Sequence, residues 1–202
     1  MPHSDWARDL RDGRAGAFWM KRGVFLDRDG VINRKADGEN YITRWEDFHF
    51  LPQVAEGIAL LNRAGWQVIV ISNQRCVSKG LLSIETLEAI HQRMSEELGA
   101  AGAKVDGVYY CPHAKEEACN CRKPAPGMLL AAAKEHQIDL RSSWMIGDSE
   151  TDVEAGKRAG CRTAQLVTSP ESANGNADLY AKCLVEASQK ILKDSAEGAG
   201  SL

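Results

Sequence analysis

The chain has 202 residues, of which 44% are hydrophobic and 26% are charged, and its formal net charge is −3. This length and this composition are typical of a single domain with a buried core. The slightly acidic balance argues against nucleic acid as the main partner, because nucleic-acid-binding proteins usually present strongly basic surfaces. No apolar run approaches the roughly 20 residues that cross a bilayer, so neither a membrane span nor a membrane partner is predicted.

The chain begins with a polar segment that is predicted to be an extension of the domain. Residues 1–22 carry scattered charges and lack the apolar core of a signal peptide. The domain itself is predicted to cover residues 23–193, followed by a flexible tail at 194–202. The chain is therefore expected to act in the cytoplasm.

A short buried strand is predicted at 24–26, and two carboxylates follow it directly. Asp27 and Asp29 are two residues apart, so in an extended chain their side chains lie on the same side, and Gly30 permits a sharp turn. Two adjacent carboxylates repel each other, and a divalent cation relieves that repulsion. Ligands that are all oxygen favour Mg²⁺. Taken alone, the pair also fits an ordinary Asp/Gly turn.

Further along the chain, apolar segments predict alternating strands and helices. Continuous apolar runs are typical of strands buried on both faces, and apolar residues at helical spacing predict the helices. This alternation indicates an α/β fold with a doubly wound parallel sheet, which binds ligands beyond the C-terminal ends of its strands. The later strands are predicted at 68–71, 105–110, 144–146 and 161–167 with a short strand before 184, and the helices at 54–64, 84–99, 127–136, 152–159 and 184–192.

Polar side chains end the second predicted strand. Ser72 offers a hydroxyl and Asn73 a side-chain amide to a phosphate oxygen. An ordinary cap between strand and loop would use the same residue types. These residues become informative only if other strand ends carry complementary chemistry.

Three cysteines and a histidine are concentrated within eleven residues after the third strand. Cys111, His113, Cys119 and Cys121 have the C-x-H and C-x-C spacing of a closed, structural zinc site. The alternatives are unligated surface cysteines or one disulfide. We expect Zn²⁺ to hold this loop in place.

Two cations follow the cysteines, and two more acids follow the fourth strand. Arg122 and Lys123 could balance the charge of a phosphate and of the carboxylates. Asp148 is placed to complete the magnesium site. Asp152 lies at a helix start, where it could cap the helix or orient Lys123, and capping alone is the favoured prediction.

In chain order, the strand ends thus carry an acidic pair, a hydroxyl, a lysine and a further acid. From residue 23 to about residue 193 the chain resembles the haloacid dehalogenase (HAD) superfamily of phosphohydrolases, whose four motifs follow this order. The corresponding segments are Asp27-Arg28-Asp29-Gly30, Ser72, Lys123, and Gly147-Asp148 with Asp152. The resemblance implies a phosphoric monoester hydrolase with a Rossmann-like sheet and little or no cap domain.

The resemblance also implies roles for these residues. Asp27 would be the nucleophile and Asp29 the general acid and base. Mg²⁺ would bind Asp27, Asp148 and the main-chain carbonyl of Asp29. The residues expected to contact the phosphate or the rest of the substrate are Ser72, Asn73, Gln74, Arg75, Arg122 and Lys123.

The zinc loop narrows the resemblance to two groups of small HAD phosphatases. The sequences C-P-H, C-N-C-R-K-P and P-G-M-L resemble the D-glycero-D-manno-heptose-1,7-bisphosphate phosphatases. The five residues between His113 and Cys119 are closer to the histidinol-phosphate phosphatases, and Arg75 departs from the small residues of the heptose enzymes. A monomeric phosphatase acting on a small phosphorylated metabolite is therefore expected, with the heptose bisphosphate as first candidate and histidinol phosphate as alternative.

Functions of other classes fit the sequence less well. A catalytically silent binding module would be expected to lack one of the catalytic groups, and here the aspartates, the lysine and the distal acid are all present. A zinc-ribbon protein that binds nucleic acid, or a phosphatase acting on DNA ends, would need a basic groove. Hydrolysis of a small phosphate ester is the predicted activity.

Overall fold

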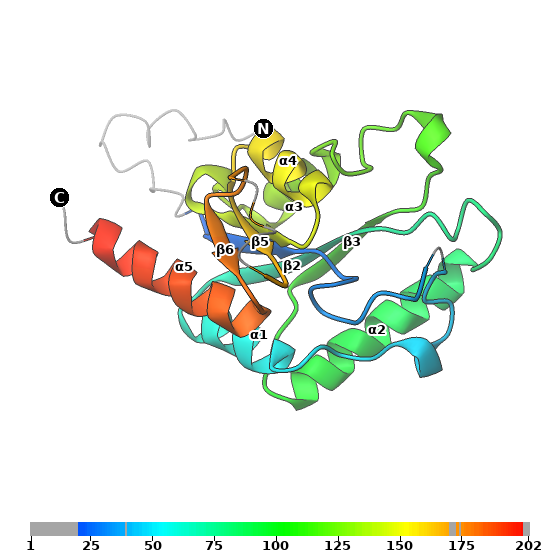
Figure 1. Ribbon diagram of the computed structural model, residues 1–202, viewed down its shortest axis with the longest axis horizontal. Coiled ribbons are helices and arrows are strands. Elements are labelled where there is room, and N and C mark those ends of the chain that lie inside the picture. The colour runs from blue at the N-terminus through cyan, green and yellow to red at the C-terminus, as the bar shows by residue number, and fades with distance from the viewer. Residues whose placement is uncertain (1–19, 39, 170–172, 174, 200–202) are drawn as a thin grey trace, which may run out of the picture.

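The computed structural model describes residues 20–38, 40–169, 173 and 175–199. Six parallel strands form one sheet in the order β3-β2-β1-β4-β5-β6 (Figure 1). The strand order reverses at the β1–β4 pair, which is where doubly wound sheets bind ligands. This confirms the predicted α/β class. The strands are β1 (Gly23–Leu26), β2 (Gln67–Asn73), β3 (Gly107–Cys111), β4 (Trp144–Gly147), β5 (Arg162–Leu166) and β6 (Leu179–Ala181).

Helices cover both faces of the sheet. Helices α1 (Val54–Arg63), α2 (Ile84–Ala100) and α5 (Leu184–Ala199) lie on one face, and α3 (Gly127–His136) and α4 (Glu150–Ala159) lie on the other (Figure 1). Short 3₁₀ turns are η2 (Trp45–Asp47), η3 (Lys115–Glu117) and η4 (Leu140–Ser142).

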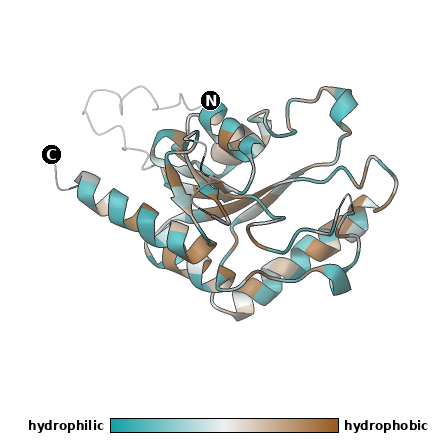
Figure 2. Cartoon of the chain, viewed as in Figure 1, coloured by the Kyte–Doolittle hydropathy of each residue, from teal (hydrophilic) through white to brown (hydrophobic). Residues whose placement is uncertain are grey.

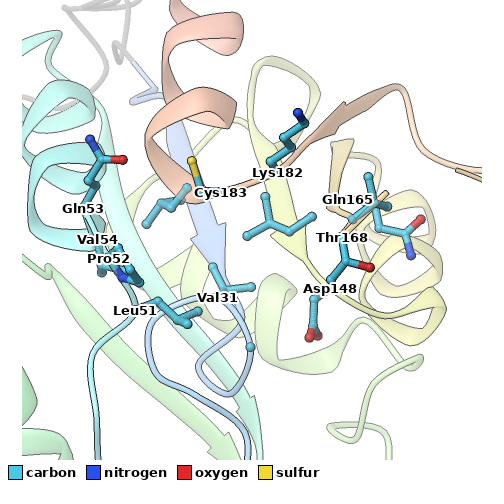
Figure 3. Close-up of a pocket in the computed structure, with 14 residues that line it drawn as sticks. Val31, Leu51, Pro52, Gln53, Val54, Asp148, Gln165, Thr168, Lys182 and Cys183 are labelled. Carbon is cyan, nitrogen blue, oxygen red and sulfur yellow. The ribbon is translucent and has the colours of Figure 1, made fainter. Parts of the chain in front are cut away.

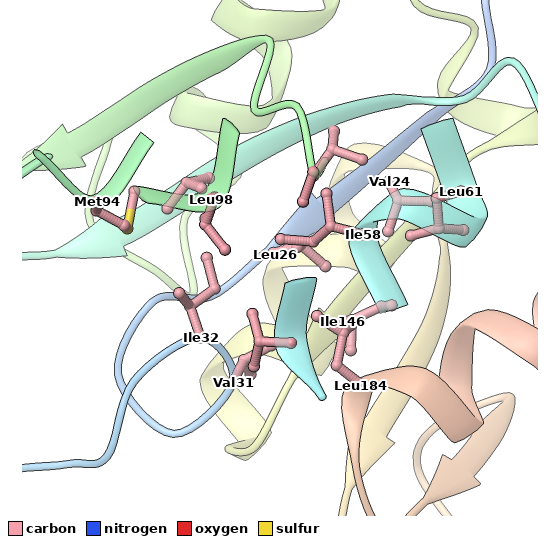
Figure 4. Close-up of a cluster of buried hydrophobic side chains, with 14 of the residues drawn as sticks. Val24, Leu26, Val31, Ile32, Ile58, Leu61, Met94, Leu98, Ile146 and Leu184 are labelled. Atoms are coloured by element: carbon pink, nitrogen blue, oxygen red, sulfur yellow. The ribbon is translucent and has the colours of Figure 1, made fainter. Parts of the chain in front are cut away.

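Alternation along β1 divides the core between these two faces. Val24 and Leu26 point to the α1 side, where they pack in the cluster that contains Ile58 and Leu184 (Figure 4). Phe25 points to the opposite side and packs in the cluster that contains Leu129 of α3. Because both faces are covered, every residue of β1 is buried.

The hydropathy of the chain follows the same division. Apolar residues are concentrated in the strands and on the inner faces of the helices, and polar residues lie outside (Figure 2). Within the described ranges, no helix combines the length and apolar character that crossing a membrane requires.

Several element boundaries differ from those predicted. The third strand ends at Cys111, one residue later than expected, which brings the first zinc-loop cysteine onto the strand itself. Helix α4 begins at Glu150, because a hydrogen-bonded capping box forms in front of it. Helix α5 continues to Ala199 rather than ending at 192.

Most of the predicted extension, residues 1–22, lies outside the described residues. Of its last residues, Lys21 forms a β-bridge with Ile138, and the backbone carbonyl of Lys21 accepts from the amide of Asp139 at 2.9 Å.

Ser83 caps α2, as its side-chain oxygen accepts from the backbone amide of Thr86 at 3.2 Å.

Candidate active site

Polar side chains from neighbouring strands meet beyond the C-terminal ends of β1, β2 and β4. Asp27 continues β1, and its amide donates to the carbonyl of Ile146 on β4 at 2.9 Å. Asp148 follows β4 directly, and carboxylate oxygens of Asp27, Asp148 and Asp152 lie within 4.8 Å of one another. The structure therefore brings together the first and fourth predicted motifs.

Lys123 lies at the centre of this group. Its side-chain nitrogen is 2.7 Å from Oδ1 of Asp27 and 2.5 Å from Oδ1 of Asp152. It also donates to the carbonyl of Ile71 at 3.0 Å, so it joins the ends of β1 and β2 to the start of α4. The ammonium is buried, and the two carboxylates raise the pKa of Lys123 although burial acts in the opposite direction. Lys123 is thus a permanent positive charge.

Asp27 is buried with an unusual protonation equilibrium. Burial raises the pKa of its carboxyl to about 7, helped by the nearby Asp152 and Asp29 and opposed by Lys123. A cation bound beside Asp27 would favour the ionised form that a nucleophile requires. Metal binding and activation of Asp27 are therefore expected to occur together.

Asp29 lies two residues after Asp27 in the sequence, but its carboxylate has different partners. It accepts from Arg28 at 2.9 Å, from Asn33 at 2.8 Å and from Gln74 at 3.0 Å. Although burial acts in the opposite direction, Arg28, Asn33 and Gln74 lower the pKa of Asp29. Since these donors occupy the carboxylate, the main-chain carbonyl of Asp29 is its better metal ligand.

Behind Asp29 lies a buried pair that the sequence analysis missed. Arg28 is 1% exposed, and one of its terminal nitrogens lies 3.1 Å from Nε2 of His91 on α2. Burial, with Arg28, lowers the pKa of His91 to about 3, so its neutral ring can accept from the guanidinium. A histidine on the apolar face of α2 was the signal that could have revealed this contact.

Asp152 makes both of the contacts considered for it, so the favoured prediction, capping alone, is wrong. Its Oδ2 accepts from the amide of Ser149 at 3.1 Å and from the Ser149 hydroxyl at 2.5 Å, which completes the capping box of α4. Its other oxygen contacts Lys123. Because Asp152 is fully buried, both contacts hold the lysine in a fixed position.

Asp148 presents one unused oxygen to the acidic group. Its Oδ1 is buried and has no hydrogen-bond partner among the described residues, while Oδ2 contacts Nζ of Lys35 at 2.6 Å. A buried carboxylate oxygen without a donor is a suitable ligand for a hard cation. With the carboxylate of Asp27 and the carbonyl of Asp29, this donor set fits Mg²⁺.

Gly30 allows this close approach. Its φ is +98°, and a Cβ at this position would lie 2.0 Å from Oδ2 of Asp148. Only glycine both adopts this conformation readily and leaves the space for the carboxylate.

The predicted phosphate-binding residues after β2 are placed differently from one another. Ser72 is buried, and its hydroxyl accepts from the amide of Gln74 at 2.7 Å. The side chain of Asn73 accepts from the amide of Lys123 at 3.0 Å and donates to its carbonyl at 3.2 Å. Asn73 and Gln74 thus position Lys123 and Asp29, and direct contact of either residue with a substrate stays a prediction. Arg75 contacts Glu116 of the zinc loop at 3.4 Å.

The four predicted zinc ligands come together in the structure. Sγ of Cys121 lies 3.3 Å from Sγ of Cys111 and of Cys119 and 3.1 Å from Nδ1 of His113. Ligand atoms of a tetrahedral zinc site with bonds of about 2.0–2.3 Å stand roughly 3.3–3.8 Å apart. These sulfurs are too far apart for disulfides, and all three cysteines are free thiols. The cluster therefore fits Zn²⁺.

A cationic recess separates the zinc cluster from Lys123. Its volume is about 340 Å³, and Lys115, Arg122 and Lys123 are among its lining residues. Arg122 donates only to the carbonyl of His113, at 3.4 Å, so its guanidinium remains available to an anion. The recess fits a second acidic group of a substrate.

An apolar pocket lies on the other side of Asp148. Its volume is about 500 Å³, with Gln53 and Val54 on one side and Asp148 and Gln165 on the other (Figure 3). Asp27, Ser72 and Lys123 do not line it. Because most of its walls are apolar, this pocket fits a phosphorylated substrate less well than the recess beside Arg122.

Comparisons with known proteins agree with this geometry. Residues 120–187 match the family model described as HAD-hydrolase-like. The chain is 41% identical over 145 residues to the D-glycero-beta-D-manno-heptose-1,7-bisphosphate 7-phosphatase of Pseudomonas putida, a match that covers 72% of this chain and 82% of that protein. The chain belongs to the heptose bisphosphate phosphatase family of HAD-like hydrolases. The predicted superfamily is thus confirmed.

Other members of the heptose bisphosphate phosphatase family match over a similar span. The enzyme of that name from Helicobacter pylori is 41% identical over 147 residues, covering 72% of this chain and 83% of its own length. A crystal structure of D,D-heptose 1,7-bisphosphate phosphatase from B. bronchiseptica, complexed with magnesium and phosphate, superposes with a TM-score of 0.77 at 30% identity. That match covers 86% of this chain and 99% of the crystallised one. As a member of this family, the chain is a phosphoric monoester hydrolase.

Proposed function

We propose that this chain is a Mg²⁺-dependent phosphatase that removes the 7-phosphate of D-glycero-D-manno-heptose 1,7-bisphosphate. The observation that carries the proposal is the buried Lys123 ammonium in contact with Asp27 and Asp152, beside Asp148. This is one fixed cation among three acids, at the switch point of a parallel sheet. The names of the relatives supply the substrate.

The proposed metal site uses residues from two strand ends. The carboxylates of Asp27 and Asp148 and the main-chain carbonyl of Asp29 would hold Mg²⁺. When bound, Mg²⁺ shields the charge between the Asp27 carboxylate and the phosphoryl oxygens. Lys123 supplies a second positive charge, which burial prevents from leaving the site.

In the first step, a carboxylate oxygen of Asp27 attacks phosphorus, and the bond from phosphorus to the sugar oxygen breaks. Asp29 gives its proton to the departing sugar oxygen, which leaves an aspartyl-phosphate on Asp27. Since Arg28, Asn33 and Gln74 favour the ionised form of Asp29, substrate binding must loosen these hydrogen bonds before Asp29 can act as an acid.

In the second step, Asp29 accepts a proton from a water molecule. The oxygen of that water attacks phosphorus, the bond from phosphorus to Asp27 breaks, and inorganic phosphate is released. The ionised form of Asp29, which Arg28 stabilises, suits this half of the reaction. Asp27 returns as a free carboxylate.

The two ends of the substrate are assigned to different cations. We assign the reacting phosphoryl group to Ser72 of β2 and to Lys123, whose ammonium contacts Ile71 of β2 and Asp27 after β1. The second phosphate would lie in the recess beside Arg122, whose guanidinium can bind phosphate through two parallel hydrogen bonds. Arg75, whose guanidinium lies 3.4 Å from the carboxylate of Glu116, would lie near the opening of that recess and affect how the second phosphate is held.

A kinetic comparison of four substrates tests the proposal. Both anomers of the heptose 1,7-bisphosphate, histidinol phosphate and an aryl phosphate would be assayed with Mg²⁺ at equal enzyme concentration. We expect one heptose anomer to give a kcat/KM at least about tenfold above that of every other compound, as a contact worth about 1.4 kcal/mol provides. Preference for histidinol phosphate would disprove the proposed substrate. Absence of hydrolysis of all four compounds would disprove the proposed phosphatase activity.

We also propose that the protein is a monomer, that it acts in the cytoplasm and that it needs no nucleic-acid partner. The formal net charge of −3 supports the last part, because it leaves little general attraction to phosphate backbones. The free thiols support a reducing compartment. Light scattering in solution would test the oligomeric state.

A further inference from the structure

One carboxylate oxygen of the proposed metal site already contacts a cation of the chain itself. Nζ of Lys35 lies 2.6 Å from Oδ2 of Asp148, and the Lys35 side chain is 54% exposed while that of Asp148 is 18% exposed. Lys35 follows the tight turn after Asp29, where no catalytic role was predicted. A flexible, solvated lysine thus caps a largely buried acid.

The local backbone makes this contact possible. Because Gly30 has no side chain, Cε of Lys35 lies only 2.7 Å from the point that a Cβ of Gly30 would occupy. Asp148 approaches the same point from the C-terminal end of the neighbouring parallel strand, β4. The contact with Asp148 raises the pKa of Lys35, although burial acts in the opposite direction, so the side chain is a full positive charge.

We propose that Lys35 competes with the catalytic Mg²⁺ for Asp148, so that metal binding releases the Lys35 ammonium toward the anionic substrate. The inference rests on the proposed function, since it needs Asp148 as a metal ligand. An ammonium and a divalent cation on the same carboxylate would repel each other strongly in a partly buried site. Because Lys35 is on an exposed loop with a long stem, it is the group that can move.

A cation-lined recess of about 710 Å³ is available to the released ammonium. Lys35 itself lines it, together with Arg34 and Lys79. The side chain of Arg34 has no hydrogen bond or ion pair with the described residues, and Lys79 lies over the ring of Tyr41, with its nitrogen 5.0 Å from the centroid. Against these three cations the lining has two acids, Asp37 and Asp47, and Asp47 is already paired with Arg44. The recess thus has a positive balance, and it adjoins the acidic cluster through Lys35.

Such a switch would couple the two ligands of the enzyme. Mg²⁺ binding would turn Lys35 from a partner of Asp148 into a partner for an anion, so metal and anion would favour each other's binding. By thermodynamic linkage, the coupling factor must be the same whichever ligand is varied. This reciprocity makes the proposal measurable without any assay of turnover.

The first measurement is the Mg²⁺ dissociation constant, obtained from the rise of melting temperature with Mg²⁺ in full-length protein with its zinc retained. For Lys35→Met we expect Mg²⁺ to bind about three- to tenfold more tightly, the range that loss of one partly exposed ion pair supports. Lys35→Arg should stay near wild type. Lys104→Met is the matched control, because Lys104 is also an exposed lysine on a largely buried acid, Asp106.

A second control distinguishes competition between Lys35 and Mg²⁺ for Asp148 from the general electrostatic effect of removing a nearby positive charge. Lys79→Met removes a lysine that lines the same recess but does not contact Asp148. Equal tightening by Lys79→Met and Lys35→Met, or no tightening by Lys35→Met, would overturn the inference. If wild-type protein binds no Mg²⁺ at all, it is the proposed function that fails.

The final measurement repeats the Mg²⁺ titration at saturating inorganic phosphate. In wild-type protein, phosphate should tighten Mg²⁺ binding by a larger factor than in Lys35→Met, because only the wild type has an ammonium to release. Lys104→Met should keep the wild-type factor. An unchanged factor in Lys35→Met would show that the ammonium does not reach the anion, and would overturn the release step.

Discussion

Nζ of Lys123 lies 2.5 Å from Oδ1 of Asp152, and both side chains are buried. The other oxygen of Asp152 accepts from Ser149, so the lysine is fixed to the first turn of α4 as well as to Asp27. A buried ion pair of this kind contributes little net stability, but removal of one partner leaves an uncompensated charge. In the proposed mechanism, Asp152 would therefore act on the reaction through Lys123, without touching the phosphate itself.

Asp152→Asn should consequently affect both stability and catalysis. We expect a loss of about 2–3 kcal/mol in the free energy of unfolding, below the full cost of breaking a buried pair because Asp27 still neutralises Lys123. The value of kcat/KM should fall about 10- to 100-fold, as the phosphoryl group meets a less well-placed cation. Asp194→Asn is the control, since its pair with Arg162 is exposed and should cost less than about 1 kcal/mol. Equal effects in the two variants would contradict this role.

Asp27→Asn should abolish turnover and leave the fold intact. An amide cannot form the aspartyl-phosphate, so kcat should fall by at least about 10⁴-fold, the scale seen when a nucleophile is removed. Steady-state kinetics and circular dichroism would be measured on protein whose mass excludes deamidation. Near-normal activity in that sample would disprove the assignment of Asp27.

The same substitution makes a prediction about pH and stability. Because burial raises the pKa of Asp27 from 3.8 to about 7, the folded state binds this proton more tightly than the unfolded state does. Wild-type protein therefore loses stability as pH rises from about 4 to about 7, whereas a protein with a neutral amide at this position does not. Without added Mg²⁺, the melting temperature of the Asp27→Asn variant relative to that of wild type should rise between pH 5 and pH 8. A constant difference over this range would contradict the raised pKa.

Loss of zinc should loosen the loop that precedes Lys123. Cys119→Ser removes one of the four ligand atoms, and we expect zinc content to fall and the melting temperature to drop by about 5–10 °C. The value of kcat/KM should also fall, because Arg122 and Lys123 follow the cluster directly. Cys183→Ser, away from the cluster, is the control. Unchanged zinc content in Cys119→Ser, measured by elemental analysis, would exclude Cys119 as a ligand.

Gly30→Ala should weaken the metal site specifically. Alanine would be strained at a φ of +98°, and its Cβ would lie 2.0 Å from Oδ2 of Asp148, so the carboxylate must move. Gly80→Ala is a matched control, because Gly80 has a φ of +68° but no atom within 4 Å of the position that a Cβ would take. Both variants should lose about 1 kcal/mol or more of stability, and only Gly30→Ala should lose Mg²⁺ affinity. Loss of Mg²⁺ affinity in both variants would point to a general effect of positive φ.

The sequence predicted those features that depend on position along a strand. Asp27 and Asp148 follow apolar strands, so their meeting at one edge of the sheet follows from parallel pairing alone. The four zinc ligands were predicted because their spacing confines them to a short loop. Both inferences need only backbone topology, and neither depends on a side-chain rotamer.

Contacts that depend on side-chain direction were not predictable in this way. Gln74 was expected to contact the substrate, and the sequence did not predict that its buried amide donates to Asp29 and Ser72. His91 is 63 residues from Arg28 in the sequence, so its place on the apolar face of α2 indicates burial, and only the packing of α2 shows that its partner is Arg28. Lys35 lies on an exposed loop whose path no periodic pattern describes.

The zinc cluster also separates the choice of leaving group from the phosphoryl-transfer chemistry, two properties that often change together in enzymes. Residues 114–118 lie between His113 and Cys119, inside the cluster, and so between two anchored points. Asn73 independently fixes the backbone of Lys123 to the end of β2. We therefore expect insertions, deletions or exchanges at 114–118, at the rim of the recess beside Arg122, to leave the lysine in place. Relatives of this enzyme could diverge in the leaving group they accept while inheriting the phosphoryl-transfer chemistry unaltered.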